Sequence, residues 1–231
     1  MKRIITGFVF LLTIIHIFAG CSSVKLTEDS IYENHLRAME RHVTTDASHY
    51  RNVLFYEFGD GSDDEFIQTV WTHGKSMYAE NVSDDGSATP ATLVYEGSMY
   101  SFSSVNDWYF IQKIEAESWP ANPKFDNTAK LIAWEENENG FSVTTEAPWL
   151  AETEMGYWLC QSPKITYFYD KSWILQSIEI VTDLYPNPNY AELLEGTKSG
   201  VCKQTCTFYK TPIDEIEQKI VKVWKVVNSK K

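Results

Sequence analysis

The sequence has few of the residues, and none of the short motifs, on which common enzymes depend. It contains four cysteines and five histidines, and it has no G-x-S-x-G elbow, H-E-x-x-H pair or phosphate-binding glycine loop. His35 and His42 are two helical turns apart, about 10 Å along a helix axis, which is too far for both to bind one metal ion. We therefore predict no catalytic residue, no metal site and no cofactor, and a protein that is not an enzyme.

Basic residues are scarce, as are the residues that interrupt regular structure. Lys and Arg number 20 against 32 Asp and Glu, which gives a net charge of −12. A negative field of this size repels nucleic acid, so we expect no nucleic-acid partner. With only 11 Gly and 8 Pro, and with 14% aromatic residues, the composition is typical of a folded, β-rich body and excludes a disordered stalk.

The first 21 residues have the pattern of an export signal. The basic pair Lys2-Arg3 precedes an apolar run over 4–18, which ends at Ala19-Gly20-Cys21. The run is shorter than the roughly 20 residues that a membrane span needs. The segment resembles the signal peptides of bacterial lipoproteins, and this resemblance implies cleavage after Gly20 and acylation of Cys21. The alternative is an ordinary secretory signal with a chance cysteine.

This signal sets the expected domain organisation and location. Residues 1–20 form the signal peptide, 21–26 the lipidated N-terminus and tether, and 27–231 one domain. Two acyl chains hold a protein on a bilayer stably. We therefore expect a diacylglyceryl group on Cys21 to anchor the protein in the cell membrane, facing outside the cytoplasm, at the cell surface or in a periplasm.

Three cysteines, Cys160, Cys202 and Cys206, remain once Cys21 is acylated. If 200–209 is a strand, Cys202 and Cys206 share one face about 13 Å apart, which is too far for a disulfide. If this segment turns instead, a local Cys202–Cys206 disulfide is the alternative.

Periodicity divides the domain into two terminal helices and a run of strands. Apolar residues at helical spacing predict a helix over 28–44, with Ser30 and Glu33 as a capping box, and Thr211-Pro212 predicts the start of a closing helix. From residue 49 the pattern alternates, and strands are predicted at 49–58, 65–73, 75–82, 90–96, 98–104, 128–137, 140–146, 154–161, 164–170, 173–182 and 199–209. Short turns between them predict one antiparallel meander, interrupted by irregular segments at 106–127 and 185–199.

This order, a helix, then long aromatic-rich antiparallel strands, then a hairpin over 165–181 and a closing helix, resembles the LolA/LppX-like superfamily of lipoprotein-associated domains. The resemblance implies an α+β fold, in which one curved antiparallel sheet forms an unclosed barrel whose hollow is covered by helices. Strand aromatics are candidates to line this hollow, and packing in an ordinary core is the alternative for each of them. The candidates are Trp71, Tyr78, Trp134, Trp158 and Phe168.

The leading functional hypothesis is a non-catalytic lipoprotein that binds or senses a lipid, a lipopeptide or another amphiphile in an apolar hollow. A second hypothesis is a structural or interaction module that docks a protein partner in the cell envelope. A third is an extracellular hydrolase that acts on carbohydrate, with carboxylates such as Glu135, Glu136, Glu152 and Glu154 as its acids.

Overall fold

A computed structural model describes residues 26–59, 61–103, 108–113, 128–151, 154–155, 158–190 and 199–229. The expected signal peptide, Cys21 and most of the tether lie outside the described residues. Within these ranges, no helix is both long enough and apolar enough to cross a membrane.

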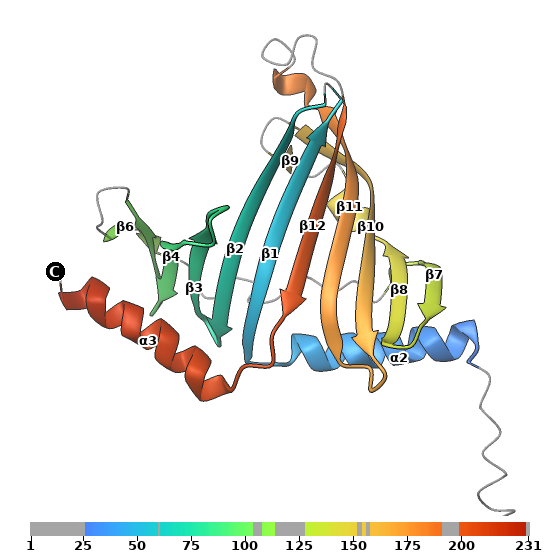
Figure 1. Ribbon diagram of the computed structural model, residues 1–231, viewed down its shortest axis with the longest axis horizontal. Coiled ribbons are helices and arrows are strands. Elements are labelled where there is room, and N and C mark those ends of the chain that lie inside the picture. Colours follow the sequence, from blue (N-terminus) through green and yellow to red (C-terminus); the bar gives the residue numbers. More distant parts are fainter. Residues whose placement is uncertain are drawn as a thin grey trace, which may run out of the picture.

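The body is a single antiparallel sheet of described strands, open at both edges (Figure 1). The strands are β1 Ala47–Phe58, β2 Asp63–His73, β3 Ser76–Val82, β4 Ala88–Tyr95, β5 Ser98–Phe102, β6 Trp108–Lys113, β7 Leu131–Glu136, β8 Gly140–Glu146, β9 Glu154–Met155, β10 Trp158–Asp170, β11 Leu175–Pro186 and β12 Gly200–Phe208. Their order is β6-β5-β4-β3-β2-β1-β12-β11-β10-β8-β7, and β9 pairs with β10. With its N-terminal and C-terminal helices, this unclosed antiparallel sheet confirms the predicted fold class.

The strand order differs from the single meander that the turns predicted. β1 to β6 form one meander, β7 to β12 form a second, and β1 pairs with β12 in the middle of the sheet, from Tyr50 opposite Phe208 to Phe58 opposite Gly200. The free edges belong to β6 and β7, which are consecutive in the chain. This pairing gives the long strand β1 partners on both sides, whereas a simple meander would leave it as an exposed edge.

Two predicted boundaries are also wrong. Part of the segment 106–127 forms the strand β6, because its aromatic residues pair with β5. The two strands predicted at 154–161 and 164–170 are largely one strand, β10, which passes Pro163 through an irregularity between Gln161 and Lys164. A bulge at this position tolerates a proline, which has no backbone N–H to donate.

Side chains alternate between the two faces of the sheet, and the pairings of β1 run without a register shift. We call the face with Tyr50 and Leu54 the inner face, and the face with His49 and Val53 the outer face. Cross-strand partners share a face, so the register assigns each strand residue to one of the two.

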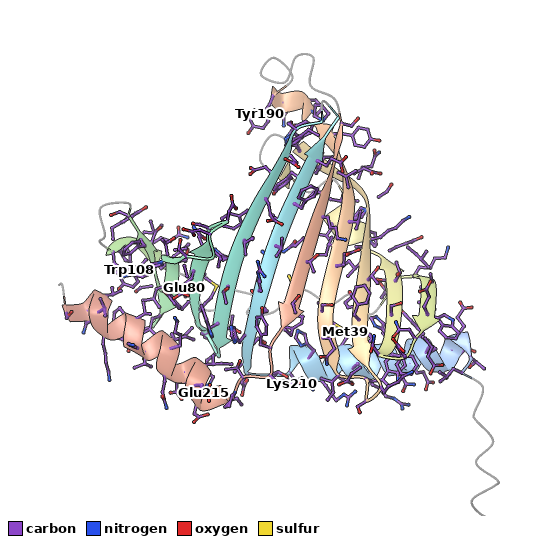
Figure 2. All side chains as sticks on the ribbon, in the orientation of Figure 1. Met39, Glu80, Trp108, Tyr190, Lys210 and Glu215 are labelled. Atoms are coloured by element: carbon purple, nitrogen blue, oxygen red, sulfur yellow. The ribbon has the colours of Figure 1, made fainter. Side chains whose placement is uncertain are left out.

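The N-terminal helix, α2 (Glu28–Val43), packs on the inner face at the lower end of the long strands in Figure 1. Its buried residues Ile31, Ala38 and Met39 belong to one cluster with Val143, Tyr167, Ile178 and Cys206, which are all inner-face residues. Figure 2 shows Met39 at this helical end and Tyr190, in the short helix Pro188–Tyr190, at the opposite end, which we call the tip.

The capping box of α2 lies three residues earlier in the sequence than predicted. Thr27 is its N-cap, with an extended backbone, and its Oγ1 accepts a hydrogen bond of 3.3 Å from the Ser30 N–H. The Thr27 N–H donates to Ser30 Oγ at 2.9 Å in return. The box is therefore formed by Thr27 and Ser30, and the predicted pairing of Ser30 with Glu33 is wrong.

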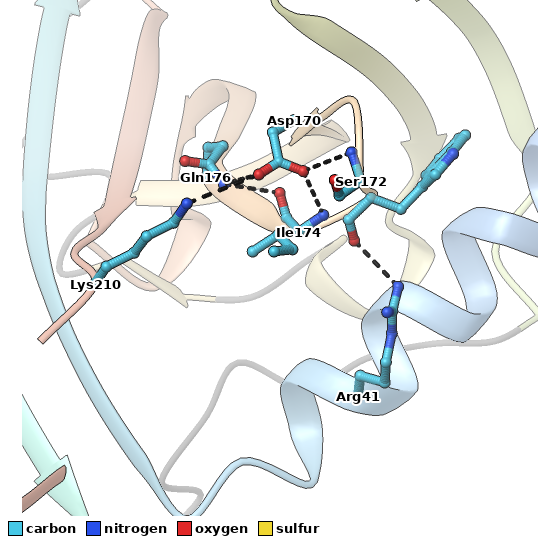
Figure 3. A network of polar contacts seen from close by, with 7 residues as sticks. Arg41, Asp170, Ser172, Ile174, Gln176 and Lys210 are labelled. Atoms are coloured by element: carbon cyan, nitrogen blue, oxygen red, sulfur yellow. Dashed lines mark hydrogen bonds and ion pairs between the residues drawn. The ribbon is translucent and has the colours of Figure 1, made fainter. Parts of the chain in front are cut away.

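A polar network joins the other end of α2 to the turn between β10 and β11 (Figure 3). The carboxylate of Asp170 accepts hydrogen bonds from the N–H groups of Ser172 and Ile174 at 2.9 and 3.0 Å. Trp173, which lies between them, has a left-handed φ of +59°, and Arg41 Nη2 donates to its carbonyl at 3.2 Å. The side chain of Asp170 thus holds a strained turn in the position where α2 contacts it.

The C-terminal helix, α3 (Ile213–Ser229), packs on the outer face. Its buried residues Ile216 and Ile220 lie in one cluster with Tyr78 and Leu93, and the register runs from His49 through Trp71 to both of these strand residues. The two helices therefore cover opposite faces, and only α2 occupies the inner one. This differs from the expectation that both helices cover a single hollow.

Candidate functional site

The five aromatic residues predicted to line a hollow are not gathered in one place. Trp71 and Tyr78 lie on the outer face beneath α3, stacked on each other with ring centroids 5.5 Å apart. Phe168 is also on the outer face, because its partner Ser177 pairs with Thr207, which is opposite Arg51. Trp134 packs on the inner face against the α2 cluster. Only Trp158 lies in the site described next, and the roles of the other four remain predictions.

The inner face between α2 and the tip carries an apolar surface, which we call the upper patch. Its half-buried or exposed members are Leu54, Tyr56, Phe58, Phe66 and Trp158. Two of them, Tyr56 and Trp158, pack against a buried cluster of Cys160, Leu184 and Cys202. Phe66, directly opposite Leu54, has 42% of its surface exposed.

Aromatic rings make up most of the upper patch. Tyr56 and Phe58 are parallel, with centroids 6.2 Å apart, and Phe58 lies 5.3 Å from Trp158. Tyr56 is opposite Cys202 on β12, and Cys160 is opposite Leu184 on β11. Strands β1, β2, β12, β11 and β10 therefore position these apolar side chains on one face, with Asp64 and Thr182 beside them.

A row of side-chain amides crosses the inner face below the upper patch. Asn81, Gln68 and Asn52 are cross-strand neighbours on β3, β2 and β1. Gln68 Nε2 donates to Asn81 Oδ1 at 3.1 Å, and Gln204 Nε2 of β12 donates to Asn52 Oδ1 at 2.9 Å. These bonds use one group of each amide. Among the described residues, Gln68 Oε1, Gln204 Oε1 and the Nδ2 groups of both asparagines keep capacity for a further hydrogen bond.

Burial favours the neutral forms of the thiol of Cys202 and the phenol of Tyr56 at the upper patch. It raises the pKa of Cys202 to about 11, with a further contribution from Cys160. Burial also raises the pKa of Tyr56, to which the nearby Cys202, Cys160 and Asp64 add. A thiol that stays protonated is a poor nucleophile. The arrangement is therefore suited to holding an apolar group and offers no activated nucleophile.

The cysteines of the described chain are all free and buried. Cys202 and Cys206 lie four residues apart in the strand β12 and point to the same face, and the disulfide considered from the sequence required a turn at this segment. Cys206 lies directly opposite Asn52, at the level of the amide row, and its Sγ donates to Asn52 Oδ1 at 3.3 Å.

This burial predicts the reactivity of the thiols. In the native protein, we expect Cys160, Cys202 and Cys206 to react with a water-soluble disulfide reagent roughly a hundredfold more slowly than a free thiol, because each pKa is raised by burial. After unfolding in guanidinium, the lipidated protein should release three equivalents, from the cysteines other than Cys21. A fourth equivalent would contradict acylation of Cys21, and fast reaction of the folded chain would contradict the burial.

The carboxylates proposed for a carbohydrate hydrolase are only partly described. Glu135 and Glu136 are consecutive in β7 and point to opposite faces, with Glu136 in an ion pair of 3.2 Å with Lys171. Glu152 lies outside the described residues. The pair in β7 therefore does not provide two carboxylates that face one substrate.

The amide row and the upper patch were visible in the sequence only as a local irregularity. The alternation that begins at Tyr50 places Asn52 among apolar inner-face residues, and Gln204 interrupts the spacing of Cys202 and Cys206 in the same way. These interruptions signal polar groups on an apolar face. What the sequence could not supply is the pairing of β1 with β12, which brings Asn52 and Gln204 together.

Comparisons with known proteins give similarity in structure alone. No protein-family model and no curated protein matches this sequence. Among solved structures, the chain is similar to a LolA superfamily protein from Nitrosomonas europaea, with 14% identity over 83% of this chain and 97% of that one, at a TM-score of 0.33. A putative outer membrane lipoprotein-sorting protein domain from Vibrio parahaemolyticus matches with 8% identity over 83% and 97%, at 0.28. A DUF1329 family protein from Desulfovibrio piger matches with 12% identity over 78% and 92%, at 0.29. Because all three TM-scores lie below 0.5, the conclusions that follow rest on this chain's own residues.

Proposed function

We propose that this protein is a lipoprotein, anchored through Cys21 in the cell membrane and facing outside the cytoplasm, which binds an amphiphile without catalysis on its upper patch. The observation that supports binding is the cluster of half-buried and exposed apolar side chains on the inner face. Leu54, Tyr56 and Phe66 lie together there with the carboxylate of Asp64 at their margin, whereas on the outer face at this height apolar residues such as Phe55 are interspersed with charged ones such as Lys203.

Exposed apolar area of this kind is costly unless something covers it. Apolar surface in water costs about 25 cal/mol per Å² relative to its burial. Half-exposed aromatic side chains gathered on one face are therefore typical of a binding surface. An acyl chain is a suitable occupant, since it needs apolar contact along its length and makes no hydrogen bonds.

The amide row supports an occupant with a polar end as well. It lies next to the upper patch on the same face, since Asn52 and Leu54 follow each other on the inner side of β1. Its unused donors and acceptors would meet a hydroxyl, ester or amide group adjacent to the acyl chain. Together, the two surfaces match a molecule that is apolar at one end and uncharged but polar at the other.

We test this proposal with a fluorescent monoacylglycerol, whose head group is polar but uncharged, titrated into the purified chain. Wild type should bind it with saturation, and the variant Phe66→Glu should bind roughly tenfold more weakly. The reason is that a carboxylate in the upper patch would lose its hydration when the ligand covers it, at a cost of about 1–3 kcal/mol.

Thr207→Glu is the matched control for this substitution. Thr207 is exposed and lies on the outer face opposite Arg51, so the new charge meets water and a basic neighbour. We expect this variant to bind the probe as wild type does, with an unchanged circular dichroism spectrum in both variants. Saturable binding that both variants weaken equally, or the absence of saturable binding by wild type, would contradict the proposal.

A further inference from the structure

A second candidate site lies on the other face of the sheet, where α3 passes two hairpin turns. The turn between β2 and β3 contains Gly74-Lys75, and the turn between β4 and β5 contains Glu96-Gly97. Both lie at the lower end of the strands beside α3 (Figure 1). Between them and the helix is a groove of about 450 Å³, which lies in the range of small-molecule sites.

Four ionisable side chains surround this groove without neutralising one another. Lys75 and His73 come from the first hairpin, Glu96 comes from the second, and Glu217 comes from α3. None of the four forms an ion pair or a side-chain hydrogen bond with another described residue. On the same helix, in contrast, Lys219 is paired with Glu80 at 2.7 Å. The floor between the charges is apolar and includes Ile220 and Tyr95.

The backbone conformation of Glu96 is an independent indication that its side chain has a role in the groove. Glu96 and Gly97 have φ values of +48° and +68°, which is the conformation of a type I′ turn. Asn, Asp or Gly is ordinarily found at the first of these positions, because other side chains are strained there. A glutamate at this position costs stability, and its longer side chain lines the groove.

The charges are divided across the groove by the order of the strands. The two turns are about two strand spacings apart, roughly 10 Å at the backbone. The ammonium group of Lys75 and the imidazole of His73 lie at the β2–β3 turn, and the carboxylates lie on the β4–β5 turn and on α3. A simple anion would face two carboxylates, and a simple cation would leave Lys75 unpaired.

We propose that this groove binds a compact zwitterion, in which an ammonium group is joined to a phosphate by a short linker. The ammonium donates to the carboxylates of Glu96 and Glu217, and the phosphate accepts from Lys75 and His73. The linker lies on Ile220 and Tyr95. This site is separate from the upper patch, since it lies on the outer face and at the opposite end of the sheet.

Two sources have this chemistry: a free solute such as O-phosphoethanolamine, and the head group of a phosphatidylethanolamine lipid. Isothermal titration calorimetry on the full chain in maltoside micelles tests both. O-phosphoethanolamine is compared with ethanolamine and with inorganic phosphate, each of which has half of its charges. We expect the zwitterion to bind roughly tenfold more tightly than either half, because its two ends are held by one linker.

In the second arm of the experiment, lysophosphatidylethanolamine is added to the micelles. Lysophosphatidylcholine is the comparison lipid, because its nitrogen has no hydrogen to donate. Tight binding of the ethanolamine lipid identifies the source as a membrane head group. Tight binding of only the soluble zwitterion identifies the source as a free solute.

Single substitutions then connect the binding to the groove. Glu217→Gln and Lys75→Gln should each weaken binding of the preferred form roughly fivefold, since each removes one charge-assisted contact. Lys222→Gln is the control, because Lys222 is exposed on the same helix and does not line the groove. Phe66→Glu should leave zwitterion binding unchanged, which separates this proposal from the function proposed for the upper patch.

The variant Glu96→Asn distinguishes a binding role from a structural one. Asparagine suits the left-handed backbone at this position, so we expect the melting temperature to rise by about 2 °C while zwitterion binding weakens. The proposal is wrong if neither form of the zwitterion binds more tightly than its halves, or if the substitutions at Lys75, Glu96 and Glu217 leave the affinity unchanged.

Discussion

Lowering the pH from 7 to 4 is expected to destabilise the folded chain by about 3 kcal/mol through His35 alone. His35 is 1% exposed on the buried side of α2, and its Nδ1 is 2.7 Å from the hydroxyl of Tyr169. Burial lowers its pKa from 6.5 to about 4. Between pH 6.5 and pH 4, the unfolded chain therefore binds a proton at His35 and the folded chain does not. The contribution of His35 to stability is fully present above pH 6.5 and is lost as the pH falls towards 4.

His42 adds to this loss in the same direction. Burial lowers its pKa as well, and its Nε2 is buried with no hydrogen-bond partner among the described residues. Guanidinium unfolding at several pH values measures the slope. In His35→Gln, which keeps polar groups near Tyr169 but does not titrate, we expect most of the loss between pH 6.5 and 4 to disappear.

His73→Gln is the control for the pH experiment, because His73 lies in a hairpin at the edge of the groove and outside both buried clusters. It should show the same pH dependence as wild type. An unchanged slope in His35→Gln would show that protonation of His35 does not limit the acid stability of the fold.

Replacing Lys219 by methionine should destabilise the protein by about 2 kcal/mol, because it leaves a largely buried carboxylate without its cation. Lys219 Nζ lies 2.7 Å from Glu80 Oε1, 4.6 Å from the ring centre of Trp71 and 5.3 Å from that of Tyr78. The side chain of Glu80 is only 16% exposed, whereas that of Lys219 is 37% exposed. Because solvent partly screens the pair, the expected loss is smaller than that for a fully buried pair.

The surface pair Lys203–Glu179 provides a matched control. Its atoms are 2.6 Å apart, but the two side chains are 48% and 26% exposed, so Lys203→Met should cost less than about 1 kcal/mol. Adding Glu80→Gln to Lys219→Met should restore part of the lost stability, since a neutral amide can still accept the hydrogen bond from Tyr78. Equal losses in Lys219→Met and Lys203→Met, measured by urea unfolding, would contradict this account.

Local patterns were sufficient to predict most elements of the fold. The helix over 28–44 and the closing helix after Pro212 follow from apolar spacing and capping residues, and both are present. Alternation located most of the strands within a few residues. The aromatic segment of β6 escaped detection, because its residues Tyr109, Phe110 and Ile111 are all exposed and show no alternation.

The faces and the site depend on contacts between distant parts of the chain, which no local pattern contains. From the sequence, Trp71 and Trp158 were both predicted to be strand aromatics that line one hollow. The strand register places them on opposite faces of the sheet. The groove beside α3 is formed by two neighbouring turns and by a helix that lies more than 100 residues further along the chain. No sequence pattern predicted this groove.

The junction of β1 with β12 has a consequence for how the chain folds as it is synthesised. A chain made from its N-terminus presents Tyr50 long before its partner Phe208. During this interval, one side of β1 has no partner strand. Closing so long a loop is slow because of its entropic cost. The first meander is therefore exposed to association with other chains until the last strand arrives, and substitutions in β12 should reduce yield before they reduce the stability of the finished protein.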